Sequence, residues 1–109
     1  MAFTVLLTED AVGDLSDIYT NVSKHDSPKN AGYVLDQIEK KFVSLSEQPE
    51  RGVYPIELLS LGICDYREIF FKPYRIIYRT DNKHVYIYLI ADGRRDMQTL
   101  LQRRMLGAL

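Results

Sequence analysis

The arginines in the second half of the chain are the residues whose type and spacing could do chemistry. Five of them lie within Tyr66–Arg95, and two more follow near the C-terminus. The seven are Arg67, Arg75, Arg79, Arg94, Arg95, Arg103 and Arg104. A guanidinium group can form paired hydrogen bonds with a phosphate or a carboxylate. A cluster of arginines is therefore typical of a surface that binds an anionic partner.

Strand alternation predicts which of these arginines share a surface. Side chains two residues apart on a strand point to the same face, so Arg75, Ile77 and Arg79 should share one face. A hairpin could place Arg67 across from them, with Arg94 and Arg95 at the rim. In an alternative interpretation, Arg75 pairs with an internal acid such as Glu68 or Asp96 and closes the fold. The sequence leaves both interpretations of Arg75 open.

The sequence gives little support for metal binding or nucleophilic catalysis. Cys64, His25 and His84 are far apart in the sequence and lack the spacing of zinc ligands. Nucleophilic catalysis by Cys64 would need a nearby base, and a lone strand cysteine usually behaves as a small apolar residue. The sequence has no phosphate-binding glycine motif and no serine-hydrolase motif. We therefore expect no metal site and no cofactor.

The first half of the chain predicts a strand and two helices. An apolar, partly β-branched run over residues 3–7 is typical of a strand. Thr8 is a suitable N-cap for a first amphipathic helix, and Ser27 with Pro28 is a strong start signal for a second. Pro49 should end the second helix. The short link between the helices predicts an antiparallel helical hairpin.

The second half changes to a period of two and predicts three strands. They cover Cys64–Phe71, Tyr74–Thr80 and His84–Ala91, with polar turns between them. The spacing favours an antiparallel meander. Residues 85–90 carry no charge, so the third strand should be central with both faces largely covered.

Two further segments join these elements. Residues 50–62 form a connection that the pattern does not assign, although its apolar side chains should contact the core or a partner. These side chains are Ile56, Leu58, Leu59 and Leu61. Asp96 is expected to cap a last short helix whose final turn holds Arg103 and Arg104, where cations oppose the helix dipole favourably. The prediction is one α+β domain over residues 1–109.

Composition limits the class of protein. Residues 1–50 carry four Lys/Arg and nine Asp/Glu, a balance of −5, whereas residues 51–109 carry ten and six, a balance of +4. The basic half suggests an anionic partner, unless the two halves neutralise each other within the domain. One cysteine, no signal peptide and no long apolar run predict a soluble cytoplasmic protein.

The order of elements and one segment of sequence resemble a known superfamily. The segment contains Tyr66-Arg67-Glu68, then PYRIIYR over residues 73–79, and then Asp92-Gly93-Arg94-Arg95-Asp96. It resembles the RelE/ParE superfamily of toxins from bacterial type II toxin–antitoxin systems, and the similarity covers nearly the whole chain. In this superfamily, RelE-like members cut mRNA on the ribosome, whereas ParE-like members poison DNA gyrase.

The resemblance implies roles for particular residues. Arg67, Arg75 and either Arg94 or Arg95 match the basic residues of the RNA-cutting members, so Arg67, Arg75 and Arg95 would be the catalytic set of a nuclease. Two departures oppose that function, because Ile69 stands at a lysine position and Leu101 on or near the position of the catalytic tyrosine. An apolar side chain cannot exchange a proton or stabilise a phosphate charge.

The departures favour the ParE branch. The resemblance then implies a toxin that inhibits DNA gyrase by binding, without being an enzyme, and that a cognate antitoxin neutralises. The seven arginines become candidate contacts with the target or the antitoxin, in a toxin–antitoxin hetero-oligomer. The alternatives are a ribosome-dependent mRNA endonuclease, in which Tyr86 or Tyr88 replaces the missing tyrosine, and an inactive homologue that only binds the antitoxin.

Overall fold

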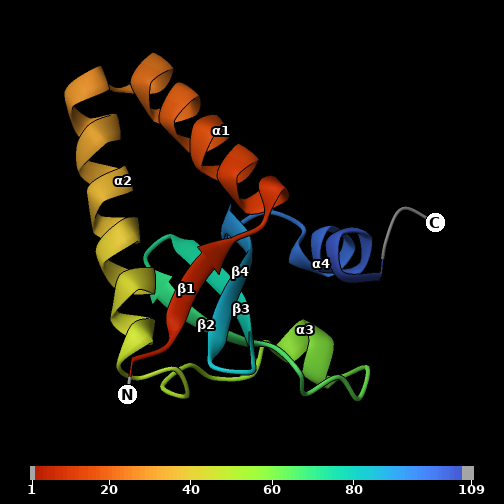
Figure 1. The fold of residues 1–109 in the computed structure, drawn as a ribbon. Helices are drawn as coiled ribbons and strands as arrows, with labels where there is room; N and C mark the ends of the chain where they lie inside the picture. Colours follow the sequence, from red (N-terminus) through yellow and green to blue (C-terminus); the bar gives the residue numbers. More distant parts are fainter. Residues whose placement is uncertain (1, 107–109) are drawn as a thin grey trace.

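Four strands form one sheet, in which the first strand of the chain lies beside the last (Figure 1). The computed structural model describes residues 2–106. The strands are β1 (Thr4–Leu7), β2 (Arg67–Phe71), β3 (Tyr74–Asp81) and β4 (His84–Asp92). Their order is β1-β4-β3-β2, with β2, β3 and β4 antiparallel and β1 parallel to β4. The predicted meander and the central position of its third strand are confirmed.

One irregularity divides β4. Ile77 of β3 pairs with Leu89, but the next residue, Tyr78, pairs with Ile87. Tyr88 is therefore an extra residue, as in a β-bulge. The bulge shifts the alternation, so that Ile87 and Ile90 belong to one core and Leu89 to the other.

The first two helices form the predicted antiparallel hairpin on one face of the sheet (Figure 1). Helix α1 (Glu9–His25) begins after Thr8, whose hydroxyl accepts from the Ala11 N–H at 3.1 Å. Helix α2 (Pro28–Val43) begins after Ser27, which caps the Asn30 N–H at 3.0 Å. A 3₁₀ turn, η1 (Ser44–Ser46), follows α2 before the chain reaches Pro49. Both predicted N-caps are confirmed.

The sheet has a core on each face. The larger core lies under α1 and α2 and includes Ile38, Phe42, Ile76 and Ile87. The smaller one lies under α3 (Ile56–Leu59) and α4 (Met97–Leu106), on the opposite face. Among residues 2–106, no helix combines the length and the apolar character that crossing a membrane requires. The predicted α+β architecture, including the C-terminal helix after Asp96, is confirmed.

The structure differs from the predictions in three segments. Helix α2 ends at Val43, before Pro49, because the chain tightens into the 3₁₀ turn Ser44–Ser46. The strand predicted from Cys64 begins only at Arg67, because the chain turns out of the ladder and the Tyr66 ring packs edge-on against Tyr88, with centroids 5.4 Å apart. The unassigned connection contains α3. Of its four apolar side chains only Leu58 is buried, whereas Ile56 is 72% exposed.

Candidate functional site

Arg75 is held by two carboxylates inside the fold. Its Nε donates to Glu68 Oε1 at 2.6 Å, and its two terminal nitrogens donate to both oxygens of Glu57 at 2.8 and 2.7 Å. The Arg75 side chain is only 13% exposed. The interpretation that Arg75 pairs with an internal acid is therefore confirmed for Glu68, whereas Asp96 caps α4 instead. This triad fastens α3 to the sheet.

The two carboxylates of the triad differ in their ionisation. The hydrogen bond from Arg75 lowers the pKa of Glu57 below its ordinary 4.5. Burial raises the pKa of Glu68 above 4.5, although the hydrogen bond from Arg75 opposes this rise. The hydrogen bond to Glu57 also raises the pKa of Arg75 above its ordinary value, so the guanidinium stays charged.

Arg67 lies on the opposite side of the sheet from Arg75 and Arg79, which corrects the predicted shared face. Arg67 pairs across the strands with Tyr78, and directly paired residues point to the same side. Tyr78 belongs to the core under the helical hairpin. Arg67 donates to the Gly52 carbonyl at 2.9 Å, and its guanidinium lies 4.7 Å from the centre of the Tyr54 ring.

Arg79 is exposed on the same face as Arg75, as predicted. A hydrogen bond to the Tyr66 hydroxyl is the main cause that raises the pKa of Arg79. Its cross-strand neighbour is Tyr86, whose ring stacks on His84. This half of the sheet face therefore presents one guanidinium among aromatic rings.

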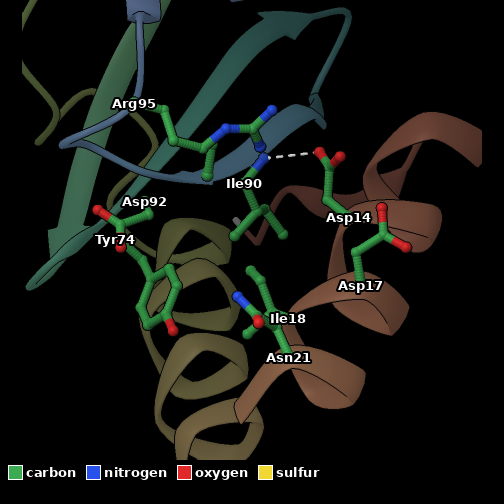
Figure 2. A pocket seen from close by; sticks show the side chains of 9 residues that line it. Asp14, Asp17, Ile18, Asn21, Tyr74, Ile90, Asp92 and Arg95 are labelled. Atoms are coloured by element: carbon green, nitrogen blue, oxygen red, sulfur yellow. Dashed lines mark hydrogen bonds between the residues drawn. The ribbon is translucent and has the colours of Figure 1, made fainter. Parts of the chain in front are cut away.

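Arg104 is also engaged within the fold. It donates to both carboxylate oxygens of Asp14 at 2.9 and 3.0 Å and to the Tyr88 carbonyl at 2.8 Å. Asp14 in turn accepts the Ile90 N–H at 2.9 Å, the bond drawn in Figure 2. The hydrogen bond to Asp14 raises the pKa of Arg104. Helix α4 is thereby joined to α1 and β4.

The double arginine after β4 is divided between two environments. Arg94 is 79% exposed and pairs with Asp92 at 2.6 Å. Arg95 is exposed and lines a hollow of about 110 Å³ between α1 and the end of β4, together with Asp17 and Tyr74 (Figure 2). On the other side Arg95 lines a second hollow, of about 180 Å³, with Arg103 of α4.

The two positions that oppose a nuclease are both buried. Ile69 is 3% exposed in the core under the helical hairpin, and Leu101 is fully buried in the core under α4. Tyr86 and Tyr88 are half-buried on the face that carries Arg79. Among residues 2–106, no three His, Cys, Asp or Glu side chains gather to hold a metal ion.

Sequence analysis missed three residues that decide which arginines are available. Glu57 and Tyr54 lie in the unassigned connection, and Asp14 lies on the first helix, where no sequence motif singles it out. Asp14 follows buried Ala11 by three residues and precedes buried Ile18 by four, so it lies close to the apolar face of α1. That position was the one available signal that Asp14 would be partly buried.

The chain is similar to known toxins in its sequence. The family model described as "ParE toxin of type II toxin-antitoxin system, parDE" matches residues 5–97. Toxin ParE3 of Caulobacter vibrioides is 30% identical over 100 residues, which cover 92% of this chain and 96% of that protein.

Solved structures share the fold. The chromosomal ParDE system of P. aeruginosa has a TM-score of 0.70 at 18% identity, covering 84% of this chain and 96% of that one. A double arginine mutant of E. coli toxin RelE in the free state has a TM-score of 0.61 at 18% identity, covering 92% and 93%. The RelBE2 toxin–antitoxin complex of Mycobacterium tuberculosis has a TM-score of 0.58 at 24% identity, covering 84% and 99%. The matches confirm the predicted superfamily and its ParE branch: this chain is a toxin of the ParE family of type II toxin–antitoxin systems.

Proposed function

We propose that this toxin acts by binding DNA gyrase and inhibiting it, without catalysing a reaction of its own, and that a cognate antitoxin neutralises it. The observation that carries the proposal is the burial of Leu101, which is 0% exposed where an RNA-cutting relative would present a catalytic tyrosine. A buried aliphatic side chain supplies no proton and no charge to a reacting phosphate.

The state of Arg75 supports the same proposal. A nuclease would need this guanidinium to stabilise charge on the RNA. Here three of its nitrogens already donate to Glu57 and Glu68. Moving Arg75 to a substrate would leave Glu68, which is 5% exposed, without its charge partner in a poorly solvated place.

The surface of the helical hairpin supports an antitoxin partner. Large apolar side chains are exposed along α1 and α2, including Val12, Tyr19 and Tyr33. A groove of about 430 Å³ runs between the hairpin and the turn that joins β2 to β3. An extended antitoxin segment could lay apolar residues on the hairpin and acidic residues near the exposed arginines. The ParDE and RelBE2 assemblies among the similar structures are named for such pairs.

A reconstituted supercoiling assay tests the gyrase proposal. Purified toxin is expected to block supercoiling of relaxed plasmid by gyrase, and premixed antitoxin, encoded by the neighbouring reading frame, is expected to restore it. Normal supercoiling with excess folded toxin would contradict the proposal.

A parallel experiment addresses the competing nuclease. Toxin added to programmed ribosomes is expected to leave the mRNA intact, as read by primer extension. Cleavage in the ribosomal A site that disappears in an Arg95→Ala variant would favour the endonuclease instead. If induced toxin affects neither growth nor either assay, the chain is an inactive antitoxin-binding homologue.

A further inference from the structure

The seven candidate arginines divide by whether the fold already uses them. Four have side chains bound to protein groups: Arg67, Arg75, Arg94 and Arg104. Arg79 has the Tyr66 hydroxyl as its neighbour. Among residues 2–106, the side chains of Arg95 and Arg103 make no hydrogen bond and no ion pair. Of the seven, these two can therefore meet an external anion without breaking a hydrogen bond or ion pair within residues 2–106.

Arg95, just before α4, and Arg103, on α4, lie on the same outer side of the molecule. Both line the same shallow hollow of about 180 Å³, with Thr99 and Leu100 between them. The inner side of α4 carries Met97 and Leu101, which are buried against the sheet. One side of α4 is thus packed, and the other presents the guanidinium of Arg103 to solvent beside that of Arg95, neither of them paired with a group of residues 2–106.

The hollow also contains one acid, Asp96, which is occupied locally. Its carboxylate accepts from the Thr99 N–H at 3.2 Å and from the Thr99 hydroxyl at 2.8 Å. These hydrogen bonds lower the pKa of Asp96, so the cap keeps its charge at neutral pH. Two cations against one engaged carboxylate leave the hollow positive.

The character of this side of α4 favours one class of partner. Its exposed residues are polar: Thr99, Gln102 and Arg103, with Arg95 just before the helix. Within residues 97–105 of α4, no large apolar side chain is exposed. A stable protein interface needs an apolar centre, whereas contacts to a phosphate backbone need only charged and polar groups.

We propose that Arg95 and Arg103 bind the phosphate backbone of a nucleic acid. The inference rests on the proposed function for its setting, because gyrase holds DNA and a toxin bound there lies near a phosphate backbone. The contact is independent of base sequence, weak alone and sensitive to salt, since two arginines neutralise about two phosphates. It would help to hold the toxin on a gyrase that is engaged with DNA.

Direct binding of the toxin to labelled duplexes tests the site. The probes are a short DNA duplex of mixed sequence and an RNA duplex of the same length, followed by fluorescence anisotropy across a salt series. The double variant Arg95→Gln/Arg103→Gln is expected to bind about tenfold more weakly at low salt, and its log–log salt slope should fall by about two. The duplex that the wild type prefers identifies the source of the backbone.

Arg94→Gln is the matched control. It also removes one exposed arginine, but that arginine is already neutralised by Asp92. The control is expected to change duplex affinity less than twofold. An equal loss in the control and the double variant, or no binding by the wild type, would overturn the proposal. Unchanged circular dichroism and urea midpoints exclude misfolding as the cause.

Binding to gyrase without DNA separates this inference from the proposed function. If the double variant keeps wild-type affinity for DNA-free gyrase but loses affinity for duplex, the phosphate site is supported. If it keeps duplex binding and loses the gyrase, the arginines contact protein and the phosphate site is wrong. A wild-type toxin that binds duplex through these residues but never inhibits gyrase would remove the proposed function and leave the phosphate site standing.

Discussion

Asp14 and Arg104, separated by 90 residues in the chain, form a bidentate ion pair beside one edge of β4. Strand β1 pairs with β4 only as far as Ile87. Beyond that point, Asp14 accepts the Ile90 N–H and Arg104 donates to the Tyr88 carbonyl. Two side chains thus provide the hydrogen bonds that a longer β1 would have made to the backbone of β4.

Removing this pair should destabilise the fold. Asp14→Ala leaves the Ile90 N–H without its acceptor and Arg104, whose side chain is 18% exposed, without its main charge partner. We expect the free energy of unfolding to fall by about 2–4 kcal/mol, measured by urea denaturation. Asp17→Ala, an exposed acid on the same helix, should change it by less than about 0.5 kcal/mol. Similar values for both variants would show that the pair does not stabilise the junction.

Acidification should affect Glu57 and Glu68 in opposite ways. The folded pKa of Glu57 lies below 4.5, so its stabilising contribution is present above pH 4.5 and is lost as pH falls through the folded value. The stability advantage of wild type over Glu57→Gln should therefore shrink below pH 4.5. The folded pKa of Glu68 lies above 4.5, so its contribution is full below 4.5 and is lost as pH rises through the folded value.

Urea denaturation of both variants over a pH series measures these contributions. Relative to Glu68→Gln, wild type should gain stability as pH falls from neutral towards 4.5, which is the reverse of the trend for Glu57→Gln. If the stability of wild type and both variants follows parallel curves with pH, the triad around Arg75 does not have the ionisation described.

Gly52 and Gly32 should respond oppositely to alanine. A Cβ at Gly52 would lie 2.6 Å from the Tyr78 hydroxyl and 2.8 Å from the Glu68 carbonyl, and that hydroxyl also accepts the Gly52 N–H at 3.0 Å. We expect Gly52→Ala to cost about 1–3 kcal/mol. Gly32 lies inside α2 with nothing within 4 Å of a Cβ, so Gly32→Ala should stabilise by about 0.5–1 kcal/mol. Thermal denaturation compares the two, and equal shifts would contradict the close approach at Gly52.

Restoring the tyrosine of an RNA-cutting relative should not create a nuclease. Leu101 is fully buried under α4, so Leu101→Tyr places the ring in the core, where it costs about 1–3 kcal/mol by overpacking. Primer extension on programmed ribosomes should show uncut mRNA with this variant. New cleavage at the A site, in a variant that folds, would mean that position 101 reaches the substrate after all.

The sequence predicted the elements well because their signals are local. Thr8 and Ser27 cap N–H groups only three residues further along, so each helix start can be read from a few residues. The strand period of two in residues 67–92 likewise depends only on neighbouring residues. The three-residue error at the start of β2 has a tertiary cause, since the Tyr66 ring turns towards Tyr88. The parallel pairing of β1 with β4 also follows from no local pattern.

The candidate surface was less predictable, because availability of an arginine depends on distant acids. Arg75 forms an ion pair with Glu57, which lies in a segment without a periodic pattern. Arg104 forms one with Asp14, near the other end of the chain. The face of Arg67 depends on the register of β2 against β3, which a shift of one residue would reverse. Which arginines remain free is thus a property of the packed chain.

The parallel pairing of β1 with β4 has a consequence for biosynthesis. Thr4 pairs with His84, which follows 80 residues later in the chain. A nascent chain that ends before His84 lacks β4, the strand that lies between β1 and β3, so the four-stranded sheet forms only after residues 84–92 have been made. Such long-range pairing also slows folding. The chain can therefore complete its fold only after the ribosome has made the central strand β4.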